Sequence, residues 1–394
     1  MEKIPFAKPY IGKEEEEAVL AILRSGWLTT GKETLEFEKD FESFLKTGDE
    51  SHYCMAVNSA TSGLHLALEA IGVGKGDLVI VPSFTFTATA EVVRYLDAEV
   101  VFVDISKNGY NMDPLALDEA LRRLDGKAKA VIPVHYGGLP CDMDAIIAIA
   151  EKHSIKVVED SAHSFPSLLP DPRSPKFAGT IGDVGVFSFY ATKPITTGEG
   201  GMVVTRNKKI ADRVKIMRAH GIDRSIWNRY TDTKASWYYE VVAPGFKYNI
   251  PDILSALGRV QLRRAMDMLS MRKEIACLYD TAFQNNSHIL IPPTGPGDAR
   301  HLYPLRLNLE NLTISRNDFM EKMQAEGVGV SVHFIPLHTM PYYIDRYDLK
   351  EDDFPETIKT YKSSISLPIW PGMNDAQIKR VIDVVETLTF KHAK

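Results

Sequence analysis

The sequence predicts an α/β protein in which a large domain carries a mostly parallel sheet sandwiched by helices, followed by a smaller C-terminal α+β domain. Short apolar runs recur in the first half of the chain, and helical patterns separate them. This alternation stops after Thr205, where longer helical stretches begin. Strands that alternate with helices are typical of parallel sheets built from right-handed crossovers.

The predicted strands of this sheet are continuous apolar runs, as expected for strands that are buried on both faces. They lie at residues 78–82, 100–104, 130–134 and 155–159. Helices are predicted between them and ahead of them, at residues 14–25, 64–71, 88–96, 113–124 and 143–153.

The second half of the chain is organised differently. Helices are predicted at residues 209–218 and 252–272, on either side of a long aromatic stretch at 222–244. A second module is expected from about Cys277, with strands at residues 302–307 and 328–334 and helices at 316–326 and 375–390. The predicted limits are an N-terminal arm at residues 1–11, a large domain at 12–272 and a small domain at 273–394.

Composition narrows the class of protein. At 394 residues, 44% apolar and 25% charged, the chain fits a soluble protein of two domains. A net charge of −6 argues against a basic face for nucleic acid. The N-terminus has no apolar signal region, and no run approaches the roughly 18 apolar residues of a membrane-spanning helix. The three cysteines are widely spaced and suggest neither disulfides nor a zinc site, so we expect a cytoplasmic protein without a metal.

Lys193 is the most informative residue of the chain. It follows an apolar run at residues 184–190 and precedes a glycine-rich turn at 198–201 and a further strand at 202–205. Catalytic groups are often held in loops at strand ends. Burial there would lower the pKa of a lysine and free its amine to form a Schiff base.

Each of the other residues near predicted strand ends has a functional and a structural interpretation. Asp160 closes a strand and would point into a ligand crevice, or it is a helix cap or a solvated acid. His163 would meet the same ligand or be an ordinary buried histidine. Phe86 offers a flat face for a ring or packs in the core. Thr61 and Ser188 could donate to a phosphate, although the stretch around Thr61 could equally be a plain helix cap.

These groups together match the needs of one cofactor. Pyridoxal phosphate requires a lysine for its aldehyde, an acid beside its pyridine nitrogen, an aromatic plate and an anion cradle. Lys193, Asp160 and Phe86 supply the first three, and Thr61 with Ser188 supplies the fourth.

The order of motifs along nearly the whole chain resembles the DegT/DnrJ family of pyridoxal-phosphate-dependent sugar-nucleotide aminotransferases, which have the aspartate aminotransferase fold (fold type I). Each motif is weak alone, but the series is specific. It comprises GWLTTG at residues 26–31, NSATSGLH at 58–65, VPSFTFTATA at 81–90, VHYGGLP at 134–140, ED at 159–160, the segment 188–201, GFKYN at 245–249, SVHFIPLH at 331–338 and SLPIWP at 366–371.

The resemblance implies a role for each matching residue. Lys193 matches the lysine that binds the cofactor and shuttles a proton, and Asp160 matches the acid at the ring nitrogen. His163 lies where the family has Gln or His near the ring's phenolic oxygen, and Phe86 matches the stacking aromatic. The residues that match phosphate contacts are Thr61, Ser62, Ser188 and, reaching from the neighbouring subunit of a homodimer with active sites at the interface, Asn249.

The resemblance also implies the reaction. An amino group would pass from glutamate through the pyridoxamine form of the cofactor to a nucleotide-linked keto sugar, as in the synthesis of amino sugars for glycans. The GWLTTG motif is more similar to enzymes that act at carbon 4 of a 4-keto-6-deoxy sugar. The alternatives are amination at carbon 3, a sugar dehydratase, or a non-catalytic regulatory homologue. Lys193 argues against the dehydratase, because those relatives have histidine there.

Three features depart from the family pattern. Pro194 stands where an asparagine is usual, and proline cannot donate a backbone hydrogen bond. The segments 164–179 and 222–244 are longer than usual, and we expect both to shape the sugar-nucleotide pocket.

Overall fold

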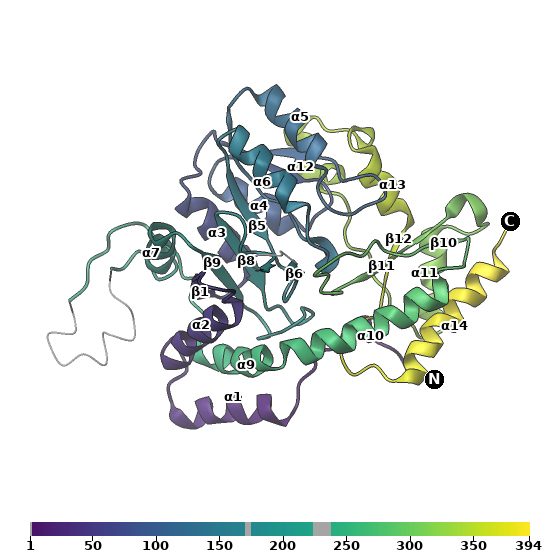
Figure 1. The fold of residues 1–394 in the computed structure, drawn as a ribbon, viewed down its shortest axis with the longest axis horizontal. Helices are drawn as coiled ribbons and strands as arrows, with labels where there is room; N and C mark the ends of the chain where they lie inside the picture. The colour runs from purple at the N-terminus through teal and green to yellow at the C-terminus, as the bar shows by residue number, and fades with distance from the viewer. Residues whose placement is uncertain (1, 170–174, 224–237) are drawn as a thin grey trace.

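The computed structural model describes residues 2–169, 175–223 and 238–394. Its centre is a seven-stranded sheet that is parallel over five strands and antiparallel at one edge (Figure 1). The order across the sheet is β1 (Tyr53–Val57), β9 (Gly201–Thr205), β8 (Val184–Ser188), β5 (Lys156–Asp160), β4 (Ala128–Val131), β2 (Leu78–Pro82) and β3 (Glu99–Val103). β9 runs antiparallel to both β1 and β8.

Helices cover both faces of this sheet because each strand sends alternate side chains to opposite sides. In β2, Val79 and Val81 belong to one apolar core, and Ile80 belongs to another. The first core includes α3 (Ala60–Ala70), α4 (Thr87–Tyr95) and α7 (Lys208–Met217). The opposite face is covered by α2 (Lys32–Leu45), α5 (Pro114–Leu124) and α6 (Met143–Lys152). The predicted mostly parallel sheet between helices is thus confirmed.

A separate apolar core lies in the C-terminal part of the chain. A three-stranded antiparallel sheet, β10 (Ile289–Leu290), β11 (Tyr303–Leu307) and β12 (Ser364–Leu367), packs there with α10 (Ala265–Phe283), α11 (Arg316–Ala325) and α14 (Asp375–Lys391). The remaining regular elements are α1 (Lys13–Ser25), α9 (Asp252–Arg263), α12 (Pro341–Tyr347), α13 (Pro355–Ser363) and a small pair, β6 (Leu168–Leu169) and β7 (Lys176–Phe177).

The prediction of one continuous helix at residues 252–272 is wrong. The chain forms two helices, α9 and α10, with Arg264 between them at φ −96° and ψ 2°. They run end to end along one side of the molecule (Figure 1). Leu262 and, beyond the break, Met268 pack in the core beneath the large sheet, while Ile275 packs in the C-terminal core. α10 therefore joins the two cores. The domain boundary predicted between residues 272 and 273 falls inside this helix, and the boundary stays a prediction.

The strand predicted at residues 328–334 is also wrong. Only isolated bridges form there, between Ile4 and Val328 and between Ser331 and Ser366. Beyond Ser331 the chain leaves the edge of the small sheet, and His333 and Phe334 reach a cavity next to the large sheet instead. Alternating Val328 and Val330 suggested a strand because both are buried, yet their surroundings are the C-terminal core and the N-terminal arm.

Within the described ranges, no helix is long and apolar enough to cross a membrane.

Candidate active site

A cavity of about 490 Å³ lies where the parallel strands end. Asp160 is the last residue of β5 and Ser188 is the last residue of β8, and both line the cavity. Open α/β sheets usually bind ligands at this end of their strands. The first turn of α3 forms another wall. The C-terminal part of the chain and the N-terminal arm complete it, through Phe6, Ala7, Lys8, Arg272, His301, Leu302, His333, Phe334, Ile369 and Trp370.

Six of the eight site residues expected from the sequence line this one cavity: Thr61, Phe86, Asp160, His163, Ser188 and Lys193. Ser62 and Asn249 are not part of its lining. The fold thus brings together residues that are up to about 130 positions apart in the chain, counting from Thr61 to Lys193.

The carboxylate of Asp160 is buried and fixed in place. The hydroxyl of Thr89 donates to Oδ2 at 2.8 Å, and the N–H of Ala162 donates to Oδ1 at 3.1 Å. Thr89 is itself hydrogen-bonded to Thr85 at 2.7 Å. Burial raises the pKa of Asp160, and these hydrogen bonds and the charge of Lys193 act against that rise. A cation placed beside this carboxylate would be stabilised by it.

Lys193 is partly buried in the connection between β8 and β9. Burial lowers the pKa of its amine to about 8, and the negative charge of Asp160 limits the decrease. An amine with this pKa is in part uncharged near neutral pH and can act as a nucleophile or a base.

Pro194 fits the turn around the lysine without a missing hydrogen bond. The N–H of Lys193 closes the turn by donating to the carbonyl of Tyr190 at 2.9 Å. The next backbone donors in use are the N–H of Thr196, which donates to Oε1 of Gln261 at 3.3 Å, and the N–H of Thr197, which donates to the carbonyl of Phe189 at 2.9 Å. The turn therefore needs no donor at position 194, and this departure from the family pattern is compatible with an intact loop.

α3 begins at Ala60, four residues earlier than the sequence suggested, and its N-terminus is the candidate anion cradle. Ser59 is the N-cap, and its hydroxyl accepts the N–H of Ser62 at 3.1 Å. Ser59, Ala60 and Thr61 line the cavity. The hydroxyl of Ser62 instead donates to Oδ1 of Asn58 at 2.7 Å, which explains why Ser62 is not part of the lining. Helix N-termini with cavity-facing backbone favour anions.

Gly201 allows the cradle to approach the sheet. A Cβ atom at this position would lie 2.8 Å from the backbone nitrogen of Ala60 and 2.8 Å from the carbonyl oxygen of Phe187. Neither backbone atom can move without shifting α3 or β8. A glycine is required here for steric reasons.

His163 has one defined tautomer. Its Nδ1 accepts the N–H of Gly137 at 3.2 Å, so the ring proton is on Nε2. Burial and the charge of Lys193 hold the pKa of His163 well below its usual value, so the ring is neutral. It stacks on Phe334, with centroids 5.7 Å apart. A neutral Nε2–H is a donor suited to an anionic ligand oxygen.

Phe86 and Phe84 have different surroundings although both follow β2. Phe84 is fully buried among Tyr110 and Tyr136, as the packing interpretation expects. Phe86 stands at the N-cap of α4 with 55% of its surface exposed, and it lines the cavity. Its ring is therefore available for stacking on a flat ligand.

Asn249 lies outside the cavity, next to the GWLTTG motif. Its Nδ2 donates to the hydroxyl of Thr30 at 2.5 Å, and its buried Oδ1 has no hydrogen-bond partner among the described residues. Asp252 holds the same motif by accepting the N–H of Gly31 at 2.7 Å and of Thr34 at 3.0 Å. No residue of the motif lines the cavity. A contact of Asn249 with a neighbouring subunit stays a prediction.

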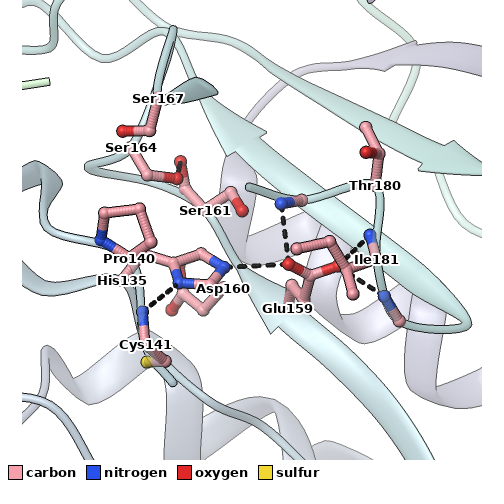
Figure 2. Close-up of polar contacts among 12 residues, drawn as sticks. His135, Pro140, Cys141, Glu159, Asp160, Ser161, Ser164, Ser167, Thr180 and Ile181 are labelled. Atoms are coloured by element: carbon pink, nitrogen blue, oxygen red, sulfur yellow. Dashed lines mark hydrogen bonds and ion pairs between the residues drawn. The ribbon is translucent and has the colours of Figure 1, made fainter. Parts of the chain in front are cut away.

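A buried acid supports the strand that carries Asp160 (Figure 2). Glu159 accepts the N–H groups of Gly179, Ile181 and Gly182 at 2.7, 2.7 and 2.6 Å, and it meets Nε2 of His135 at 2.9 Å. Burial alone would raise the pKa of Glu159, but the hydrogen bonds outweigh it and lower that pKa. Glu159 thus anchors the end of the segment 164–179 to β5.

The two long segments are only partly described. Residues 170–174 and 224–237, which include the stretch from Trp227 to Trp237, lie outside the described residues. None of the described residues of 164–179 and 222–244 lines the cavity. Their influence on the substrate pocket stays a prediction.

The sequence did not single out the cavity residues contributed by the C-terminal part. Arg272 and His301 carried no local signal, because each stands in an ordinary helical or loop pattern. Trp370 was visible only as part of the SLPIWP motif. His333 was visible only as part of the SVHFIPLH motif. Their convergence depends on how the C-terminal core packs against the large sheet.

Comparisons with known proteins agree with this site. The model of the DegT/DnrJ/EryC1/StrS aminotransferase family matches residues 9–386. The spore coat polysaccharide biosynthesis protein SpsC of Bacillus subtilis is 42% identical over 389 residues, covering 98% of this chain and 97% of its own.

Two solved structures illustrate the structural likeness. Spr1654 from Streptococcus pneumoniae, solved in a PMP and a PLP form, has a TM-score of 0.88 and 31% identity over 99% of this chain, with 98% of its own chain covered in the PMP form. PseC of Helicobacter pylori, an aminotransferase involved in the biosynthesis of pseudoaminic acid, has a TM-score of 0.88 and 28% identity over 99% of this chain and 100% of its own.

Proposed function

Because the chain belongs to the DegT/DnrJ/EryC1/StrS aminotransferase family, we propose that it moves an amino group from glutamate to carbon 4 of a nucleotide-linked 4-keto-6-deoxy sugar. The family consists of sugar aminotransferases that depend on pyridoxal phosphate, so this chain is a transaminase with that cofactor. The donor, the nucleotide and the carbon position are the parts that the proposal adds.

One observation carries the proposal: Lys193 and Asp160 face the same cavity, beside the N-terminus of α3. The residues fit the cofactor group by group. The α3 turn and Ser188 would hold the phosphate, Asp160 the ring nitrogen, His163 the phenolic oxygen and Phe86 the ring face. When bound, pyridoxal phosphate supplies an aldehyde that accepts the amino group and a ring that stabilises a carbanion.

The chain's own residues then carry the proton chemistry. With the cofactor bound, Nζ of Lys193 would take a proton from the donor's α-carbon and pass it to the aldehyde carbon of the cofactor. A pKa of about 8 leaves part of this amine uncharged near neutral pH, so that it can act as the base. The Asp160 carboxylate is fixed by Thr89 and Ala162, and it would keep a proton on the ring nitrogen of the bound cofactor. The N–H of Gly137 leaves the proton of His163 on Nε2, which would donate to the phenolic oxygen of the cofactor.

Carbon 4 is favoured by the GWLTTG motif, and a role in glycan synthesis is supported by the likeness to SpsC and PseC. The motif packs on Asn249 outside the cavity of its own chain. We propose that both face the active site of the second subunit of a homodimer. Amination at carbon 3 is the second candidate. A dehydratase is disfavoured because Lys193 can return the amine.

A substrate screen tests the proposal. Purified protein with bound cofactor is incubated with glutamate and with UDP-, dTDP- and GDP-linked 4-keto and 3-keto sugars, and amino sugars are detected by mass spectrometry. We expect amination of a 4-keto sugar by the wild type and none by Lys193→Ala, which should also lack the visible absorption band of the bound cofactor. A Lys208→Ala variant, altered at an exposed helix position, serves as control and should keep both. Oxygen loss without nitrogen transfer would instead identify a dehydratase.

A further inference from the structure

Arg272 is a buried cation that faces the cavity. It stands on α10, its residue is only 4% exposed, and it is part of the cavity lining. Burial lowers its pKa to about 10, and no carboxylate contributes to that pKa. The guanidinium is therefore still charged at neutral pH, and burying it without an opposite charge is unfavourable.

The guanidinium is held in a fixed orientation with part of its donors unused. Nη1 donates to the carbonyl oxygens of Ile369 at 2.5 Å and of His301 at 3.3 Å. Nε is buried without a hydrogen-bond partner, and Nη2 makes no hydrogen bond to the described residues. Nε and Nη2 are the two donors on one edge of the guanidinium fork, the edge that pairs with both oxygens of a carboxylate.

The neighbouring side chains leave the positive charge uncompensated. His301 stands between Arg272 and His163, with the His163 and His301 ring centroids 4.6 Å apart. Burial, followed by the nearby His163 ring and the positive charges of Lys193 and Arg272, holds the pKa of His301 well below its usual value. His333 has its pKa lowered to about 4 by burial and by Lys193. This wall of the cavity thus carries neutral imidazoles and one cation.

We propose that Arg272 binds a carboxylate of the amino donor through Nε and Nη2. The assignment rests on the proposed function, which requires an amino acid to enter this cavity. A small dicarboxylate can reach a residue that is 4% exposed. A sugar-nucleotide diphosphate has bulky groups on both sides and needs a more open surface. The cofactor phosphate has its own cradle at Ser59, Ala60 and Thr61, on the large sheet rather than on α10.

Calorimetric titration of the cofactor-bound protein with glutarate tests the assignment. Glutarate carries the two carboxylates of glutamate but no amine, so its binding does not depend on catalysis. We expect Arg272→Gln to weaken glutarate binding at least tenfold, and Arg272→Lys to retain part of the affinity because it keeps the charge but lacks the fork. Arg306→Gln is the matched control, since Arg306 is 5% exposed with an unpartnered Nε but lies outside the cavity.

Two further measurements separate this proposal from its rivals. The visible cofactor band and the melting temperature of each variant report whether the fold and the cofactor are retained. Titration with UDP reports on a diphosphate. Wild type that does not bind glutarate, a glutamine variant that binds it as tightly as wild type, or a loss of UDP binding with glutarate binding intact would each overturn the assignment. Failure of the proposed function would appear separately, as absence of amination for every keto sugar while glutarate binding persists.

Discussion

At the scale of single residues, Lys193 and Asp160 influence each other through charge. Burial lowers the lysine's pKa to about 8, and the carboxylate limits that decrease. The same lysine lowers the pKa of Asp160, which burial raises. Each residue therefore keeps the other closer to its charged form in the cofactor-free protein.

This coupling predicts a pH dependence of cofactor uptake. Only the uncharged amine reacts with an aldehyde, so the rate of uptake by cofactor-free protein should rise with pH through a midpoint near 8. In Asp160→Asn the charge that raises the lysine's pKa is absent, and the midpoint should move to lower pH. Stopped-flow absorbance at several pH values measures both. A midpoint near 10, the value of an exposed lysine, would contradict the burial of Lys193.

Glu159 is a second residue whose negative charge matters, because it contributes to the free energy of unfolding. Glu159→Gln replaces a carboxylate that accepts four hydrogen bonds, and it should lower the free energy of unfolding by about 3 kcal/mol because buried donors lose their partner. The folded-state pKa is depressed, so the contribution is present above the unfolded pKa of 4.5 and is lost as pH falls through the folded value.

Urea unfolding of wild type and variant at several pH values measures that contribution. The stability difference should be constant near neutral pH and should shrink on acidification below about pH 4.5, since both chains then carry an uncharged side chain. Glu119→Gln, a change at an exposed position of α5, is a control expected to alter stability by less than about 0.5 kcal/mol. A difference that grew in acid would mean that Glu159 is already protonated in the folded state.

At the scale of elements, the contact between α3 and β9 sets the position of the anion cradle. Gly201→Ala places a Cβ atom 2.8 Å from the nitrogen of Ala60 and should push the first turn of α3 out of place. We expect at least a tenfold loss of affinity for pyridoxal phosphate, measured by fluorescence titration. Gly74→Ala is the matched control, because its Cβ atom meets no heavy atom within 4 Å. Equal affinity of the two variants would contradict the cradle.

The elements also show what the sequence could and could not predict. The strands of the parallel sheet are continuous apolar runs between turn residues. The pattern predicted β2 with its bounds, placed β3 and β5 one residue off, and placed β4 two to three residues too late. The start of α3 was placed too late because the small polar residues from Ala60 to Gly63 do not have an apolar period. The break at Arg264 has no local mark in the sequence, since neither glycine nor proline stands beside it. The cofactor residues near Lys193 were recognised from their order in the chain, whereas Arg272 was not, since only tertiary packing brings α10 to the cavity.

At the scale of the whole molecule, the position of Asn249 outside its own cavity suggests that a complete site needs two chains. In the proposed homodimer, a mixture of Lys193→Ala and Asn249→Ala chains would contain dimers with one intact site, made of Lys193 from one chain and Asn249 from the other. Unfolding and refolding the two inactive variants together should restore about a quarter of the wild-type activity per chain, since about half of the dimers are mixed.

The same variants refolded separately provide the baseline and should stay inactive or weakly active. Light scattering of each sample establishes that dimers have formed. Restoration of activity to no more than the sum of the separate variants would place Asn249 and Lys193 in the same subunit's site, or show that Asn249 has no part in it.

The bridge between Ile4 and Val328 has a consequence for how a ribosome delivers this protein. The arm that lines the cavity through Phe6 and Lys8 leaves the exit tunnel first, but its pairing partner emerges more than 300 residues later. At a synthesis rate of roughly 5–20 residues per second, the arm stays unpaired for tens of seconds while the large sheet can already form. A bulky tag fused to the N-terminus would therefore interfere least with the sheet and most with closing the cavity.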